Sequence, residues 1–224
     1  MIHSEGIFFL PKASLRTNAD FMKSAMESEW LGLKSYQEGL EIQTLKHKIT
    51  GKTKTPFLLG LEHQNVLSLG LRSHKDSDSY QFTEDFEVFL SRRGGHATIH
   101  NPGQLVIYPI VPLREWKMGV SDFVCLLIKT TKALLSSYGV ESFEKGEPGL
   151  FTKNGKIALF GIQVSQGVSL HGLALNVNND LTPFSQIPVC NVKGESMDRL
   201  SHYKQDLDLS HLFSQWAEIF KGKL

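Results

Sequence analysis

The sequence predicts an α+β fold, in which helices pack on a mixed β-sheet. Short apolar runs bounded by turn residues recur along the chain, as strands in hairpins do. Three longer segments carry apolar residues at helical spacing. Because the order mixes hairpins with a few helices, we expect a mixed sheet. No repeat or interdomain linker is visible, so residues 1–224 are expected to form a single domain.

The composition restricts the class of protein. Of the 224 residues, 41% are hydrophobic and 21% are charged, as in an ordinary globular domain with a substantial core. The net charge of +1 gives no overall attraction to nucleic acid or to an anionic membrane, so neither is expected as a partner. Two cysteines are too few for a disulfide framework, and no segment could span a bilayer. We therefore expect a cytoplasmic protein.

The first clear element is a helix that begins at Ser35. Before it, Phe8 to Leu10 fit a strand and Asn18 to Met26 fit a helical turn or two. Ser35 and Glu38 match a capping box, and apolar residues follow at helical spacing. Four lysines then lie within nine residues: Lys46, Lys48, Lys52 and Lys54. We interpret this basic segment as a solvated loop; the alternative is a docking patch for an acidic partner.

Four apolar segments predict strands in the middle of the chain. They are Phe57 to Leu61, Val66 to Leu69, the alternating residues Phe86 to Leu90, and Leu105 to Val111. The last is β-branched and apolar, which is typical of a central strand. Ser121 then caps an amphipathic helix that Gly139 ends.

The second half of the chain predicts a loop, a hairpin and a last helix. Gly146 to Asn154 is expected to be a loop. Lys156 to Val164 and Val168 to Val177 are the two strands of the hairpin. Ser210 caps the last helix, and its apolar stripe is interpreted as core.

A glycine-rich stretch before the central strand indicates a binding site. It reads Arg93, Gly94, Gly95, His96, Ala97, Thr98, Ile99 and His100. Glycine pairs let a backbone approach a ligand closely, because no Cβ intervenes; a plain turn is the alternative. Neither a dinucleotide fingerprint nor a phosphate-binding loop is present. His96 and His100 have no third ligand nearby, so no metal is expected.

Cys190 is the best candidate nucleophile, because it lies in a predicted loop where a thiol can be reached. A free thiol has a pKa of about 8.5 and needs a neighbouring base or cation. Lys156 is a candidate partner because it opens an apolar strand; the alternative is a strand-end charge that points to solvent. Cys125, within a predicted helix, is expected to be buried and structural. His171 lies within a predicted strand, where it is either a site residue or a half-buried, hydrogen-bonded histidine.

Together these residues resemble the bacterial octanoyltransferases, the lipoyl(octanoyl) transferases that are also called lipoate-protein ligase B. The glycine-rich stretch, the strand that starts at Lys156, the segment His171 to Val177 and Cys190 follow that family's order and spacing. Gly60 to Gly70 and Gly149 to Phe151 are similar too. The resemblance covers about residues 30–200.

The resemblance implies a fold similar to that of lipoate and biotin protein ligases. It implies transfer of an octanoyl group from octanoyl-acyl carrier protein to a lysine of a lipoyl domain, the first step of protein lipoylation, without a cofactor. The implied acceptors are lipoyl domains of 2-oxoacid dehydrogenase complexes or the glycine cleavage H protein. Cys190 would carry the acyl thioester, and Lys156 would lower its pKa. The implied substrate-binding residues are Arg93 to His100 with Leu159, Phe160, Gly161, Gly172, Leu173 and Ala174.

The sequence departs from the family at two positions, where Asn101 and Asn191 replace usual glycines. Two alternatives therefore stay open. One is an ATP-dependent lipoate- or biotin-type ligase of the same fold. The other is a non-catalytic module that binds lipoyl domains.

Overall fold

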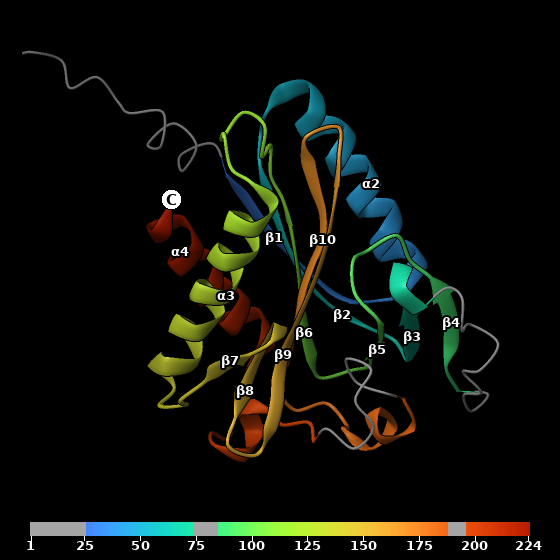
Figure 1. Ribbon diagram of the computed structural model, residues 1–224, viewed down its shortest axis with the longest axis vertical. Helices are drawn as coiled ribbons and strands as arrows, with labels where there is room; N and C mark the ends of the chain where they lie inside the picture. The colour runs from blue at the N-terminus through green and yellow to red at the C-terminus, as the bar shows by residue number, and fades with distance from the viewer. Residues whose placement is uncertain (1–25, 74–84, 188–195) are drawn as a thin grey trace, which may run out of the picture.

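The computed structural model describes residues 26–73, 85–187 and 196–224. These residues form a seven-stranded sheet, a three-stranded sheet and three α-helices (Figure 1). The large sheet has the strand order β1-β2-β6-β10-β9-β8-β7, and the small sheet has the order β4-β3-β5. The mixed sheets and their helices confirm the predicted fold class.

The strands of the large sheet are β1 (Glu27–Lys34), β2 (Phe57–His63), β6 (Gln104–Ile110), β7 (Phe143–Lys145), β8 (Glu147–Thr152), β9 (Gly155–Ser165) and β10 (Val168–Asn176). The strands of the small sheet are β3 (Val66–Leu69), β4 (Glu87–Leu90) and β5 (Ala97–His100). The helices are α2 (Tyr36–Thr53), α3 (Val120–Ser137) and α4 (Leu209–Lys223), with 3-10 turns at η2 (Thr182–Gln186) and η3 (Leu200–His202).

Most neighbouring strands are antiparallel. The exceptions are the pairs β1–β2 and β3–β4, which are parallel. The predicted hairpin is confirmed: β9 and β10 pair antiparallel from Ser165 opposite Val168 to Ala158 opposite Leu175. Its two turn residues, Gln166 and Gly167, have φ values of 53° and 82°. Positive φ at both positions matches the twist of the flanking strands.

Helices cover both faces of the large sheet (Figure 1). On one face, Phe123 of α3 and Trp216 of α4 are fully buried against sheet residues such as Leu105. The Trp216 Nε1 donates to Thr131 Oγ1 at 3.0 Å, which joins these two helices. On the other face, α2 packs over a cluster that includes Leu59 and Val106. The core therefore has two layers separated by the sheet.

The small sheet has its own apolar cluster. Leu67 and Leu69 of β3 and Ile99 of β5 pack with Phe184 and Ile187, which follow β10 in the chain. This packing brings the end of η2 against β5. It matters for the site, because β5 carries part of the glycine-rich stretch.

The capping box of α2 is confirmed, but the interpretation of the basic segment as a loop is wrong. Ser35 accepts a hydrogen bond from the Glu38 backbone, and the Glu38 carboxylate accepts one from the Ser35 backbone at 2.8 Å. The helix continues through the basic segment to Thr53, since lysine is a good helix former and the next proline is Pro56. The lysines thus lie on or at the end of a helix. Two of them pair with acids at 3.3 Å: Lys46 with Glu29 and Lys54 with Glu115.

Two other helix caps each lie two residues before the predicted one. Helix α3 begins after Gly119, so Ser121 lies inside its first turn. Helix α4 is capped by Asp208, whose carboxylate accepts from the His211 backbone at 2.6 Å. A carboxylate at this position is as good a cap as the predicted serine.

Two further predictions are wrong. The loop predicted at residues 146–154 contains the whole of strand β8, because Gly149 to Thr152 pair with β9. Cys125 is exposed rather than buried, because it lies on the outward face of α3 between the half-buried Val124 and Leu126. The elements predicted before residue 26 lie outside the described residues.

Candidate active site

A cavity of about 350 Å³ lies among β5, β9, β10 and the start of α3. Its wall contains Lys156 and thirteen of the fourteen binding residues that the resemblance implies: Arg93, Gly94, Gly95, His96, Ala97, Thr98, His100, Leu159, Phe160, Gly161, Gly172, Leu173 and Ala174. The fourteenth, Ile99, points the other way into the cluster around Leu67. Side chains alternate along a strand, so Thr98 and His100 face the cavity and Ile99 does not.

Glycines let the loop at Arg93 lie directly on β9. The Gly94 backbone N–H donates to Ile162 O at 3.0 Å. A Cβ on Gly161 would lie 3.0 Å from Gly94 O, which is tighter than most Cβ contacts and would push the loop outward slightly. A Cβ on Gly172 would lie 2.1 Å from Ile107 O in the neighbouring strand β6. These glycines therefore allow close backbone contacts around the cavity.

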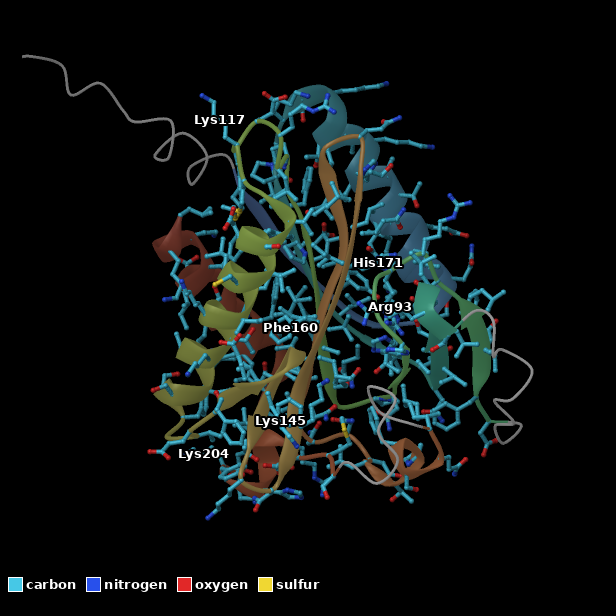
Figure 2. All side chains as sticks on the ribbon, viewed as in Figure 1. Arg93, Lys117, Lys145, Phe160, His171 and Lys204 are labelled. Atoms are coloured by element: carbon cyan, nitrogen blue, oxygen red, sulfur yellow. The ribbon has the colours of Figure 1, made fainter. Side chains whose placement is uncertain are left out.

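Arg93 fixes the position of this loop. It is buried, and its guanidinium donates to Ser68 Oγ at 3.0 Å, to Ser68 O at 2.6 Å and to Gly94 O at 3.1 Å. Burial lowers the pKa of Arg93 from its usual value. Arg93 and His171 lie on the side of the β9–β10 ribbon that faces α2, and Phe160 lies on the side that faces α3 (Figure 2). The cavity therefore has a polar wall and an apolar wall.

Histidine and tyrosine side chains form the polar wall and its support. His63 Nδ1 donates to Lys34 O at 3.2 Å, so Nε2 of its neutral ring accepts from Tyr108 OH at 2.7 Å. Burial lowers the pKa of His63 to about 4. Burial and the neighbouring His63 hold the pKa of His100 well below its usual value. Both rings are therefore neutral at pH 7.

His171 lines the cavity and has an unusual backbone conformation. Its φ is 57°, in the left-handed region that residues other than glycine rarely adopt. Its N–H donates to Gln43 Oε1 of α2 at 2.8 Å, which holds this conformation. The side chain is buried and lines the cavity, and burial lowers its pKa to about 4.

Lys156 is buried, so the alternative that it is a strand-end charge pointing to solvent is wrong. It is only 1% exposed and lines the cavity. Its Nζ lies 5.2 Å from the centroid of the Phe151 ring, within the range of a cation–π contact. A Cβ on Gly149 would lie 2.5 Å from Lys156 Cε and 2.9 Å from Nζ, so the lysine occupies space that only glycine leaves open.

Cys190 and Asn191 lie outside the described residues, but both flanks of their segment are described. On the N-terminal side, Ile187 is buried in the small-sheet cluster, which also contains Ala97 of the cavity wall. On the C-terminal side, Ser196 O accepts a hydrogen bond from the Lys156 backbone at 2.8 Å.

Asn101, the other departure from the family, is built into the structure. It is buried, its Nδ2 donates to Asp180 O at 2.8 Å, and its Oδ1 accepts from Asn179 Nδ2 at 3.0 Å. The amide thus ties β5 to the loop after β10, which a glycine could not do.

Several wall residues were not singled out as binding residues in the sequence: Tyr36, Arg72, Val106, Tyr108, Val120, Val124 and Ile162. Tyr36 and Val120 begin helices, and their helical periodicity gives no sign of a site. In the described parts of the chain, no cluster of three metal-ligating side chains exists. None of the helices described combines the length and apolar character needed to cross a bilayer.

Sequence comparison gives the family. Residues 35–221 match the model of the lipoyl protein ligase A/B catalytic domain. An octanoyltransferase of Cellvibrio japonicus is 39% identical over 172 residues, which are 76% of this chain and 79% of that protein. One from Ectopseudomonas mendocina is 38% identical over 169 residues, covering 75% of this chain and 81% of that protein.

Solved structures give the same fold. A lipoate-protein ligase A bound with ATP matches with a TM-score of 0.67 at 14% identity, over 88% of this chain and 84% of that chain. A biotin protein ligase from Aquifex aeolicus, in complex with biotin and ATP, matches with a TM-score of 0.51 at 13% identity, over 88% and 69%. The fold agrees with the family model and with the curated relatives. This chain therefore belongs to the lipoyl protein ligase A/B family and, within it, to the octanoyltransferases.

Proposed function

We propose that the chain transfers an octanoyl group from octanoyl-acyl carrier protein to a lysine of a lipoyl domain, through a thioester on Cys190. One observation supports this most: Lys156, a buried lysine, opens onto the same cavity as the glycine-rich loop. The names of the curated relatives support the reaction, and the family match supports a lipoyl domain as acceptor. We further propose that residues 1–224 form one catalytic domain.

The reach of the chain supports Cys190 as the nucleophile. Cys190 is three residues after Ile187, and a chain of three residues spans at most about 11 Å. Ile187 belongs to the same apolar cluster as Ala97 of the cavity wall. Because Ala97 and Lys156 line the same cavity, this reach supports a place for the thiol at that cavity. A free thiol of this kind persists in a reducing compartment, so we place the protein in the cytoplasm.

The reaction needs no external energy. The Cys190 thiolate attacks the carbonyl carbon of the octanoyl thioester, and the carrier sulfur leaves as a thiol with the proton that the Lys156 ammonium gives up. The acceptor lysine amine then attacks the acyl-cysteine, forms an amide and releases the Cys190 sulfur. Lys156 stabilises the thiolate in the first step and accepts the proton of the attacking amine in the second. Thioester exchange is nearly neutral and amide formation is downhill, so no ATP is required.

The apolar wall suits the acyl chain. Leu159, Phe160, Leu173, Ala174 and Val124 supply hydrocarbon surface. Burying about six methylenes at about 0.8 kcal/mol each contributes about 5 kcal/mol before the costs of binding. The cavity volume lies in the range common for small-molecule sites.

Intact-mass spectrometry after incubation with octanoyl-acyl carrier protein tests the proposal. We expect an octanoyl adduct on Cys190 without ATP, and its transfer to an added lipoyl domain. Cys190→Ser should abolish the adduct. Full activity of Cys190→Ser with free octanoate and ATP would indicate a ligase instead. No adduct with the parent chain, together with binding to the lipoyl domain, would indicate a non-catalytic module.

A further inference from the structure

Asp198 is a fully buried carboxylate that does not line the cavity. Its Oδ2 accepts hydrogen bonds from Thr152 Oγ1 and from Tyr203 OH, the latter at 2.6 Å. Its Oδ1 accepts from the Arg199 backbone at 2.9 Å and from His202 Nδ1 at 2.7 Å. Four donors from β8 and from residues 199–203 thus converge on one side chain. A buried carboxylate with this many donors is strongly fixed in place.

The backbone of the same residue is bonded to Lys156. The Asp198 N–H donates to Lys156 O at 2.9 Å, and Ser196 O accepts from the Lys156 N–H at 2.8 Å. These two bonds make a short parallel bridge centred on Met197. A Cβ on Gly155 would lie 2.3 Å from Ser196 O, so the two chains touch at this point. Residues 196–198 therefore lie alongside the start of β9.

A chain of side-chain hydrogen bonds links this bridge to the cavity wall. Asn176 Nδ2 donates to Asp198 O at 3.1 Å, and Asn176 Oδ1 accepts from Gln104 Nε2 at 2.9 Å. Gln104 Oε1 accepts from His100 Nδ1 at 2.7 Å, and His100 lines the cavity. Residues 196–198 are thus held from three sides by β8, β9 and β10.

We propose that Asp198 is a positioning residue: it holds residues 196–198 against the start of β9 and so fixes the place of the Lys156 amine in the cavity. This inference rests on the proposed function. Asp198 touches no substrate and acts only through the bridge to Lys156. Without its carboxylate, the four donors lose their common acceptor, and the start of β9, with Lys156, is no longer held in its present place.

The titration of the Cys190 thiol reports this effect directly. An ammonium close to a thiolate lowers the thiol pKa, and the effect weakens as the two groups separate. The carboxylate itself stays ionised at neutral pH. Although desolvation raises the pKa of Asp198, the hydrogen bonds from Thr152, Tyr203 and His202 outweigh it, and the net pKa is lowered. A change in the thiol titration near neutral pH therefore cannot come from titration of Asp198.

The test compares Asp198→Asn with Asp206→Asn in the full chain. Asp206 is exposed and is a matched control in the same segment. The rate of iodoacetamide alkylation is measured against pH, with peptide mapping to separate Cys190 from the exposed Cys125. We expect Asp198→Asn to raise the pKa of the Cys190 thiol by about 1 unit toward its free value and to slow octanoylation at pH 7 about tenfold. Asp206→Asn should change neither.

A folded Asp198→Asn chain with the parent thiol pKa and acylation rate overturns the inference. If this variant does not fold, Tyr203→Phe is tested instead, because it removes one of the four donors and leaves the carboxylate. We expect it to raise the thiol pKa by a smaller amount. No change in the thiol pKa would overturn the inference. Failure of the proposed function is distinguishable: the parent chain would then form no octanoyl adduct, whereas the alkylation measurement needs no acyl donor.

Discussion

At the scale of single residues, the position of the Lys156 side chain depends on the absence of a Cβ at Gly149. A Cβ on Gly149 would lie 2.5 Å from Lys156 Cε, 2.9 Å from Nζ and 3.4 Å from Ala158 O. The first two distances are too short, so Gly149→Ala must move the lysine away from its present place. We expect this variant to lose at least tenfold in the rate of Cys190 octanoylation at pH 7, measured by intact mass against time.

Gly222→Ala is the control for this substitution, because nothing lies within 4 Å of the added carbon. It should acylate at the parent rate. Equal rates for Gly149→Ala and the parent, in a folded protein, would show that the position of the lysine is not critical.

Removing the amine itself tests the cysteine–lysine pair more directly. Lys156→Met keeps an unbranched apolar side chain in this buried place but has neither the charge nor the base. We expect the octanoyl adduct to disappear or to form at least a hundredfold more slowly, because the thiol stays largely protonated at pH 7. Intact-mass spectrometry measures the adduct, and circular dichroism checks the fold. Normal acylation in this variant would refute the pair.

At the scale of elements, α4 packs closely on the large sheet because Gly60 of β2 has no side chain. A Cβ on Gly60 would lie 2.4 Å from Phe213 Cγ and 2.5 Å from Cδ2. Gly60→Ala therefore forces the ring, and with it α4, away from the sheet. We expect the free energy of unfolding to fall by about 1–3 kcal/mol, the usual cost of overpacking, as measured by urea denaturation.

The same substitution at Gly51 should act in the opposite direction. Gly51 is exposed on α2, and nothing lies within 4 Å of an added Cβ. Alanine is the better helix former, so Gly51→Ala should raise the free energy of unfolding by up to about 1 kcal/mol. A loss of stability at Gly51 as large as at Gly60 would contradict the packing argument.

Local patterns predicted the elements well where periodicity and turn residues agree. The β9–β10 hairpin, β6 and the capping box of α2 were found in this way. Strand β8 was missed, because Gly146 and Gly149 indicate a loop when the pairing with β9 is unseen. The exposure of Cys125 was missed for a similar reason: which face of α3 is buried depends on the sheet and α4.

At the scale of the whole molecule, the cavity is assembled from distant segments. The resemblance supplied Arg93 to His100, Lys156 and the glycines of β9 and β10, and the fold brings the described ones together except for the side chain of Ile99. The sequence could not supply the supports. Tyr36 OH lies 3.1 Å from Ser68 Oγ, and Asp198 is bonded to Lys156, across long stretches of chain. Such contacts follow from topology rather than from any local pattern.

The buried histidines give the whole fold a predictable dependence on pH. His63 and His171 each have a pKa of about 4 in the folded chain, lowered by burial from about 6.5 when unfolded. The unfolded chain therefore binds more protons between these values. Their contribution to stability is present above pH 6.5 and is lost as the pH falls toward 4. The loss is on the order of 3 kcal/mol for each histidine, a large part of the stability of a typical domain.

Urea denaturation at a series of pH values should show a plateau above about pH 7 and a steep fall between pH 6.5 and 4. Asp180, Asp198 and Asp208 have lowered pKa values and contribute their own losses only below this window. His100, whose pKa is also lowered, adds to the fall in the same window. His63→Gln removes one of these titrations, so its curve should be shallower in this window even if the variant is less stable at pH 7. A slope equal to that of the parent chain would mean that His63 is not neutral and buried beside Tyr108, and that the polar wall of the cavity has a different hydrogen-bond arrangement.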